Sequence, residues 1–171
     1  FLKSVNKTKQ TTDALKIIKV RASKMESSGY KNPGKMLALI NATKEQIEEI
    51  CNIPSIVIAN VNSPYQTVVS GSKNQIEKAL HLSKKINIRK VIKLNVSGAF
   101  HSPLMEDVTE DLKKTLDSVN FNDAIIPVYQ NMTSKPTFKA DDLKINLLKI
   151  PNKNLLILIK SFGDSEVVQP L

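Results

Sequence analysis

The block of residues 35–95 constrains the fold most strongly, because β-rich and helical segments alternate there in a fixed order. Its β-rich segments are short runs of β-branched and aliphatic residues that stop at polar or turn-forming residues. Each of its two expected helices follows a capping box, in which a Ser or Thr precedes a Gln by three residues. The order β-α-β-β-α-β is that of a split βαβ unit and predicts a ferredoxin-like subdomain. The expected strands are residues 35–41, 55–60, 66–70 and 89–95, with a turn at 62–64, and the capping boxes are Thr43 with Gln46 and Ser72 with Gln75.

A helix is predicted over residues 12–25, ahead of that block, because apolar residues recur there at helical spacing. Arg21 breaks the pattern, since it projects from the apolar face, where a guanidinium must pair with an anion or extend to solvent. Gly29 and the Asn-Pro-Gly run at 32–34 are expected to end the helix. The apolar arc holds Ala14, Leu15, Ile18, Ala22 and Met25, and the opposite side holds Lys16, Lys19 and Lys24.

The loop at 96–103 holds His101 and leads into a predicted helix. Ser102 is expected to be the N-cap and Pro103 the first helical residue, with Glu106 and Asp107 in the first turn. The positive end of that helix favours a neutral imidazole, which is the form that can act as a general base. A structural or solvated His101 is the alternative. His81 lies in a Lys-rich segment and is expected to be an exposed helix residue.

The rest of the sequence contains no recognisable nucleophile that His101 could activate as a general base. A strand at 124–129 and a helix at 141–150 are predicted, and the last twenty residues fit no clear pattern. Cys51, the single cysteine, lies on the apolar face of a short helix and is expected to pack there. The sequence has no metal-ligand spacing, no glycine-rich phosphate loop and no G-x-S-x-G nucleophile elbow.

The net charge of +9 comes almost entirely from dispersed lysines. Coding bias in an AT-rich genome is one explanation. Attraction of an acidic partner, such as nucleic acid, a phosphate-bearing cofactor or an acidic carrier protein, is the other. The longest apolar run, residues 155–159, is far shorter than the roughly 20 residues of a membrane-spanning helix. The 171 residues are expected to form one core with an inserted subdomain and, without an initiating Met, to be part of a longer chain.

Three separated motifs carry a family resemblance. Residues 96–105, VSGAFHSPLM, resemble the active-site histidine motif of the malonyl-CoA:acyl carrier protein transacylases, the acyltransferase family of fatty acid and polyketide synthesis. Residues 13–21 and 60–71 resemble two further motifs of that family in order and spacing. The resemblance implies an α/β fold, with a ferredoxin-like subdomain inserted in an α/β-hydrolase-like core that is only partly present. By this resemblance 1–32 is a helix of the large core, 33–96 the small subdomain and 97–171 the return to the core, with a poorly matching tail after about 149.

The resemblance also implies roles for five residues. His101 resembles the general base that activates the family's serine, and Arg21 resembles the arginine that holds the malonyl carboxylate through paired hydrogen bonds. Phe100 precedes the histidine as in malonyl-selective members, and its bulk disfavours methylmalonyl. Asn60 and Asn62 match an asparagine-containing turn near the site. An Asx turn without substrate contact is the alternative for these two residues.

The implied function is transfer of malonyl from malonyl-CoA to the phosphopantetheine thiol of acyl carrier protein in fatty acid biosynthesis, through an acyl-serine. That serine belongs upstream of Asp13, and residues 1–10 hold no counterpart, so this part alone is expected to be an incomplete acyltransferase. The family's glutamine that orients the histidine also has no clear match at 149–151, where the sequence is Lys-Ile-Pro.

The resemblance implies malonyl-CoA and acyl carrier protein as partners, no cofactor or metal, no nucleic acid, no membrane, and a monomer. The compartment would be a bacterial cytoplasm, or the matrix of a plastid or mitochondrion. The alternatives are an inactive fragment that docks a carrier protein and an RNA-binding module. RNA binding on such a sheet normally uses aromatic residues of central strands, and 35–41 and 89–95 contain none.

Overall fold

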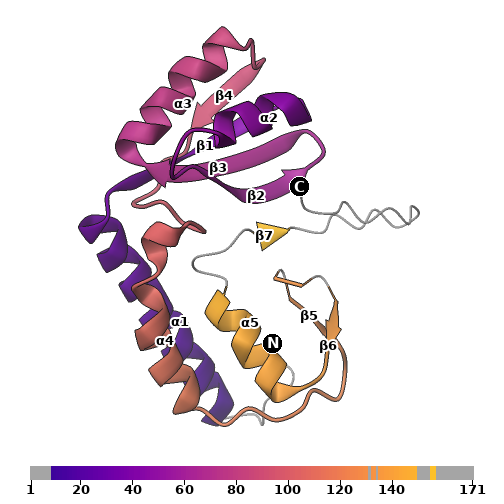
Figure 1. Ribbon diagram of the computed structural model, residues 1–171. Coiled ribbons are helices and arrows are strands. Elements are labelled where there is room, and N and C mark those ends of the chain that lie inside the picture. Colours follow the sequence, from indigo (N-terminus) through magenta and orange to yellow (C-terminus); the bar gives the residue numbers. More distant parts are fainter. Residues whose placement is uncertain (1–8, 131, 134, 150–154, 157–171) are drawn as a thin grey trace.

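The structure is a computed structural model that describes residues 9–130, 132–133, 135–149 and 155–156. The chain forms an upper sheet unit and a lower helical part (Figure 1). The helices are α1 (Lys9–Lys31), α2 (Lys44–Cys51), α3 (Lys73–Lys85), the 3-10 turn η2 (Pro103–Met105), α4 (Val108–Asp117) and α5 (Ala140–Lys149). The strands are β1 (Gly34–Ile40), β2 (Val57–Ser63), β3 (Gln66–Ser72), β4 (Lys90–Lys93), β5 (Val128–Tyr129), β6 (Pro136–Thr137) and β7 (Leu155–Leu156).

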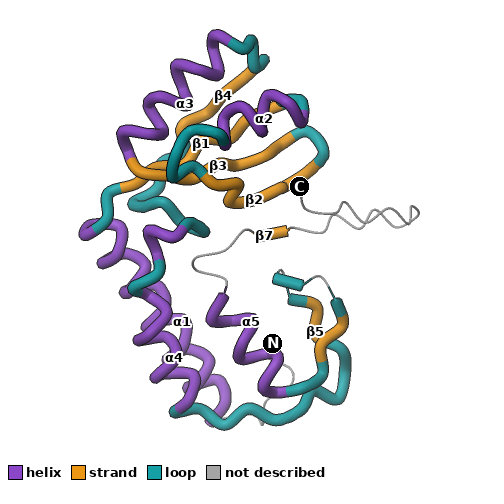
Figure 2. Tube along the Cα trace, in the orientation of Figure 1, coloured by secondary structure: helices purple, strands orange, loops and turns teal. Residues whose placement is uncertain are grey.

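The main sheet has the strand order β4-β1-β3-β2-β7. The first four strands pair antiparallel, and β7 pairs parallel with β2. The predicted β-α-β-β-α-β order is therefore confirmed, and β1 through β4 form a small antiparallel sheet. Figure 2 shows α2 and α3 beside this sheet. We call residues 34–93 the sheet unit.

Apolar side chains alternate between the two faces of the sheet, as the period of a strand requires. One face packs against α2 and α3, and its core joins Leu37 and Leu39 of β1 to Ile50 and Ile76 of the helices. The other face holds Met36, Ala38, Ala59 and Val68, against which Val96 and Phe100 of the following loop pack. The second face therefore fixes the start of the loop that carries His101.

Local signals explain the first helix of the sheet unit better than the second. The Thr43 hydroxyl accepts a hydrogen bond from Gln46 N, and the Gln46 side chain accepts one from Thr43 N, so the predicted capping box is present. Ser72 is the N-cap of α3, but its side chain makes no capping hydrogen bond. The second capping box is therefore wrong, although the helix begins where it was expected.

The helical part is built on α1 and α4, with α5 next to them (Figure 1). Its core consists of Ile17, Leu112, Leu116 and Val119. The predicted buried face of α1 is wrong in part: Ala14 and Ile17 are each 5% exposed, whereas Leu15 is 60% and Ile18 55% exposed. The helix thus has two apolar faces, and α4 covers only one of them.

Several predicted element boundaries also shift. α1 continues to Lys31 and includes Gly29, where the helix lies so close to the loop at 97–98 that a Cβ would be 2.7 Å from Ser97 O. β2 runs through Asn62 to Ser63, so the turn occupies residues 64–65 and begins two residues later than predicted. The strand predicted at 124–129 is reduced to β5, whose partner β6 has two residues. The tail after 149 lies outside the described residues, apart from β7.

Candidate functional site

The loop that carries His101 is shaped by Ser102. The Ser102 side chain is 1% exposed; its hydroxyl donates to Ala99 O at 2.6 Å and accepts from Leu104 N at 3.3 Å. Ser102 is the N-cap and Pro103 opens η2, as predicted. His101 itself is half-buried and has a φ of 60°, in the left-handed region that few non-glycine residues adopt. Such a conformation persists only where the surrounding contacts hold it.

The helix that follows the histidine differs from the prediction. η2 contains three residues, and α4 begins only at Val108, with Glu110 and Asp111 in its first turn. Glu106 and Asp107 therefore lie outside the helix that was expected to hold them. Because a three-residue turn has only a small dipole, the helix-end argument for a neutral His101 loses its basis.

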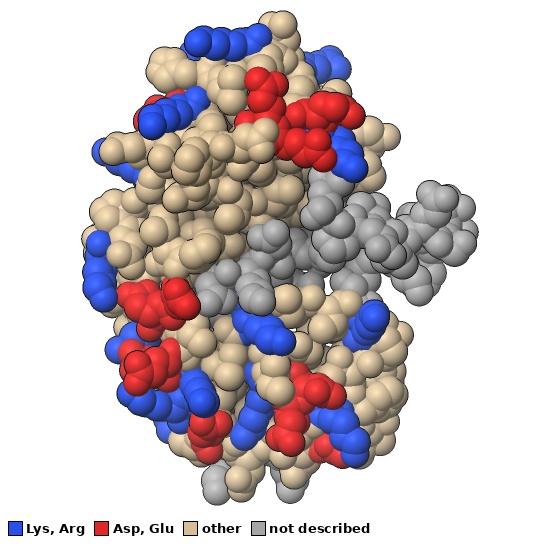
Figure 3. Space-filling model, in the orientation of Figure 1, with Lys and Arg blue, Asp and Glu red and all other residues tan. Residues whose placement is uncertain are grey.

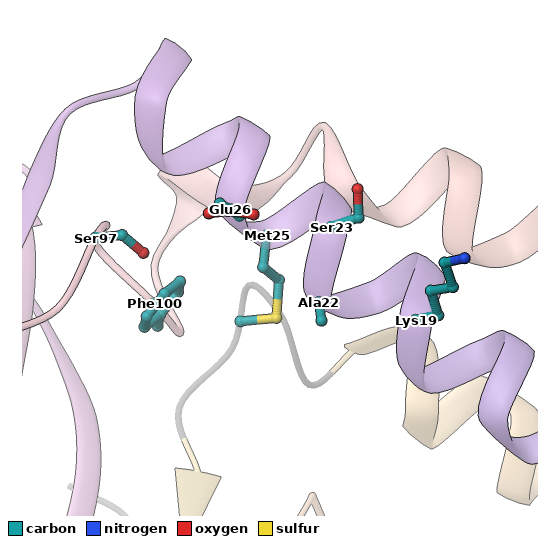
Figure 4. A pocket seen from close by; sticks show the side chains of 7 residues that line it. All are labelled: Lys19, Ala22, Ser23, Met25, Glu26, Ser97 and Phe100. Carbon is teal, nitrogen blue, oxygen red and sulfur yellow. The ribbon is translucent and has the colours of Figure 1, made fainter.

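A pocket of about 550 Å³ lies between α1 and the loop at 97–100 (Figure 4). Phe100 and Met25 point into it from opposite walls. Arg21 and His101 are not among its lining residues, but each is the chain neighbour of one. The structure therefore brings α1 and the histidine loop to one opening. The lining residues are Lys19, Ala22, Ser23, Met25, Glu26, Ser97 and Phe100.

Arg21 is partly buried on α1, and its buried Nε has no hydrogen-bond partner in the part of the chain that the structure describes. Burial lowers the pKa of its guanidinium from the usual value. A buried donor without a partner is costly, and an anionic ligand would offset that cost. The arginine that breaks the apolar pattern of α1 thus has a buried Nε–H available to an anionic ligand, which is a property expected of an anion-binding side chain.

Asn60 and Asn62 lie on β2. Among the described residues, the buried Asn60 Oδ1 atom has no hydrogen-bond partner. The Asn62 amide donates to Gln66 Oε1 at 3.4 Å across the hairpin. The turn after β2 is instead bridged by Ser63, whose hydroxyl accepts from Tyr65 N at 3.2 Å. The Asx turn proposed for the asparagines is therefore replaced by a serine turn, and their contact with substrate stays a prediction.

The other candidate groups in the described residues show no sign of a catalytic or metal-binding role. Cys51 is half-buried, and burial raises the pKa of its thiol to about 11, so the thiolate is scarce at neutral pH. His81 is exposed on α3, as predicted. Within the described ranges, no cluster of His, Cys, Asp or Glu could hold a metal ion. No described helix is both long and apolar enough to cross a membrane.

The surface charges are mixed on the face seen in Figure 3, where Lys and Arg alternate with Asp and Glu over both regions. Charged residues of both regions also form pairs: Lys24 Nζ lies 2.7 Å from Asp111 Oδ2, and Lys93 Nζ lies 2.7 Å from Glu77 Oε1. This face therefore carries no single basic patch of the kind expected for nucleic-acid binding.

Comparison with known proteins adds a family match. The acyl transferase domain family matches residues 4–146. The malonyl CoA-acyl carrier protein transacylase of Staphylococcus aureus strain MRSA252 is 33% identical over 142 residues, which are 80% of this chain and 46% of the relative. The chain thus spans about half the length of the curated relatives it matches.

Solved structures agree with this match. The malonyl-CoA:ACP transacylase of Synechocystis sp. PCC 6803 has a TM-score of 0.72 at 33% identity, covering 82% of this chain and 46% of that one. A malonyl-transacylase in complex with its type II polyketide synthase acyl-carrier protein has a TM-score of 0.78 at 24% identity, covering 84% and 48%. At that identity the second likeness concerns the fold alone.

Proposed function

Because this chain belongs to the acyl transferase domain family, we propose that it is the part of a malonyl-CoA:acyl carrier protein transacylase that binds the malonyl group and supplies the general base. The observation that carries the proposal is the buried Nε–H of Arg21, available to an anionic ligand, on the helix that shares a pocket with the histidine loop. Malonyl bears a free carboxylate, which a guanidinium can hold through two charge-assisted hydrogen bonds.

In this proposal His101 moves one proton in each half of the reaction. His101 accepts the proton of a serine hydroxyl as the serine oxygen attacks the thioester carbonyl. The carbon–sulfur bond breaks, and the coenzyme A thiolate takes that proton. The carrier's thiol then gives a proton to His101 and attacks the serine ester, and the proton returns to the serine. The serine comes from a segment outside this sequence.

Phe100 is the proposed selectivity residue. It packs against the sheet face formed by Met36 and Ala38 and also lines the pocket. An aromatic ring packed against the sheet cannot easily move back from the pocket, so it would exclude an α-methyl branch from the pocket. Acyl carrier protein is the proposed acceptor; the solved complex of a transacylase with its carrier, which shares the fold, supports that choice.

Exposed apolar side chains support the proposal that a further segment packs against this chain. Leu15 and Ile18 project from α1 with more than half of their surface exposed, and Ile125, which lies after α4, is 97% exposed. Apolar surface of this kind is usually covered. About half of each relative's length has no counterpart in this chain, and a polypeptide corresponding to that half would cover these residues.

The proposal is tested by supplying a relative's serine-containing segment, fused or coexpressed, and measuring malonyl transfer from malonyl-CoA to the carrier. His101→Ala should lower the rate by roughly 10²- to 10⁴-fold, the usual contribution of a general base. His81→Ala is the matched control and should leave the rate unchanged. Full activity of the His101 variant would refute its role.

Arg21 has a test of its own in the same assay. Arg21→Ala should reduce malonyl transfer about 10- to 100-fold more than acetyl transfer, because only malonyl bears the carboxylate and a charge-assisted hydrogen bond contributes about 1.5–3 kcal/mol. Arg21→Lys should recover part of the loss but not the bidentate contact. Equal losses for the two acyl groups would contradict the clamp.

A further inference from the structure

We propose that Ser28, Asn32 and Asp107 form a latch that positions His101 relative to Arg21. The proposal rests on the proposed function, because it concerns the placement of the proposed base and of the proposed carboxylate-binding residue. Ser28 lies in the last turn of α1, and Asn32 directly follows the helix, with its N–H donating to Ser28 O at 2.8 Å. In the sequence, Asn32 stands out only as part of a helix-ending run, and no motif singles out Ser28.

The latch holds the chain just after His101. Ser28 is 2% exposed, and its hydroxyl donates to Asp107 Oδ1 at 2.5 Å and lies 3.1 Å from Leu104 O. The Asn32 amide also donates to Leu104 O, at 3.1 Å. These bonds join residues more than seventy positions apart in the sequence. They fix the turn that follows the histidine to the last turns of α1.

The Asp107 side chain bonds to α1 and makes no capping bond to α4, the helix that it precedes. It occupies the N-cap position of α4, where an aspartate normally accepts from backbone N–H groups, yet its side chain makes no capping bond. One carboxylate oxygen accepts from Ser28, and the other lies 3.7 Å from Lys31 Nζ. Both partners of the Asp107 carboxylate therefore belong to α1.

The same part of α1 also holds the chain just before His101. A Cβ on Gly29 would lie 2.7 Å from Ser97 O, and a Cβ on Gly98 would lie 3.0 Å from Gly29 Cα. The helix and the loop thus touch through their backbones, which only glycine at both positions permits. His101 lies between two attachments, at 97–98 and at 104–107, and both are made to the last turn of α1 and to Asn32, the residue after it.

Arg21 is on that same helix, seven residues before Ser28. Seven residues are about two turns, or roughly 10 Å along the helix axis. Because a helix is stiff over this length, fixing the loop to residues 28–32 also fixes its place relative to Arg21. The latch further accounts for the left-handed φ of His101, a conformation that neighbouring contacts must hold. A purely structural contact would stabilise the fold but would leave the His101 environment unchanged when it is removed.

The test is an NMR comparison of the two imidazole rings in the isotope-labelled chain. The sequence has two histidines, so exposed His81 is an internal reference for His101. Ser28→Ala should move the His101 ring resonances and the φ-dependent backbone coupling of His101, while the His81 signals stay in place. Ser28→Thr, which keeps the hydroxyl, should restore the original His101 signals. Ser27→Ala, at an exposed position on the same helix, is the matched control.

Unchanged His101 signals in folded Ser28→Ala would overturn the proposal. If that variant does not fold, Asp107→Ala and Asn32→Ala replace it and are judged by the same two criteria. Since these spectra need no activity, the latch can fail while malonyl transfer is found, and the converse also holds. In the serine-supplied enzyme, Ser28→Ala should lower kcat on the order of 10- to 100-fold for malonyl and acetyl alike, as misplacement of a base does. A change confined to KM would contradict the positioning role.

Discussion

The sheet unit and the helical part differ in how completely each covers its own apolar surface. Nine buried residues form the core of the sheet unit between the sheet and its two helices. The corresponding core of the helical part has four, and Leu15, Ile18 and Ile145 stay substantially exposed there. The core between the sheet and its two helices therefore has all its packing partners within residues 34–93. The core of the helical part instead joins residues that are far apart in the sequence. Part of the apolar surface of this region is not covered by the described residues.

The largest expected effect tests this difference directly. Ile76 is 1% exposed between α3 and the sheet, so Ile76→Ala should lower the free energy of unfolding by about 2–5 kcal/mol. Ile18 is 55% exposed on α1, so Ile18→Ala should change it by less than about 0.5 kcal/mol. Urea unfolding followed by circular dichroism measures both. Similar losses for the two variants would remove the distinction between the regions.

An intermediate effect sharpens the comparison within the sheet unit. Thr43→Ala removes the hydroxyl that accepts from Gln46 N in the capping box of α2, whereas the backbone N–H of residue 43 can still donate to Gln46, and it should cost about 1 kcal/mol. Ser72→Ala changes the N-cap of α3, whose side chain makes no capping bond, and should cost only a few tenths of a kcal/mol. The same urea titration ranks the two variants. A larger loss for Ser72 than for Thr43 would contradict the assignment of the caps.

The smallest expected effects concern one exposed ion pair in each region, and they should be of similar size in both. The hydrogen bond from Lys93 lowers the pKa of Glu77 in the sheet unit, and that from Lys24 lowers the pKa of Asp111 in the helical part. A lowered carboxyl pKa contributes stability above the unfolded pKa, and that stability is lost as pH falls through the folded pKa. Glu77→Gln and Asp111→Asn should therefore flatten the acid side of the stability profile slightly, and to a similar degree, because both pairs are exposed.

Thermal unfolding between pH 2 and pH 7, at low and high salt, measures these two carboxylates. The flattening should shrink at high salt, since salt screens exposed charges. A large loss at pH 7 for either variant would show that the pair is more than a surface contact. The difference between the regions would then lie in their charges as well as in their apolar cores.

The elements that could be predicted from the sequence are those with local causes. The order of strands and helices in 35–95 follows from short β-rich runs and a capping box, whose partners are three residues apart. The N-cap at Ser102 was predictable for the same reason. Arg21 was identified because a charge on an apolar face is visible in the periodicity alone. The roles of Phe100, Asn60 and Asn62 and the carboxylate-binding role of Arg21 came from the resemblance. The general-base role of His101 came both from its expected place ahead of a helix and from the resemblance. All of these roles stay predictions.

Features with distant causes were missed. The periodicity of α1 does not distinguish the face that meets α4 from the face that stays exposed, because both are apolar. The strand expected at 124–129 shortened because the length of a strand depends on its partner, here two residues of β6. The Ser28–Asp107 bond spans 79 positions, and the local pattern instead placed Asp107 in a first helical turn. A glycine within a helix, here Gly29, was the one available sign of a close backbone contact.

The contact of Gly29 with residues 97–98 has a consequence for how this architecture can vary. It brings the place where the chain leaves α1 next to the place where it returns from the sheet unit. An insert whose two ends meet can be exchanged, lengthened or circularly permuted with little disturbance to its host. The sheet unit thus departs from the helical part and rejoins it at one place, and any exchange of this unit would have to keep the sheet face against which Val96 and Phe100 pack.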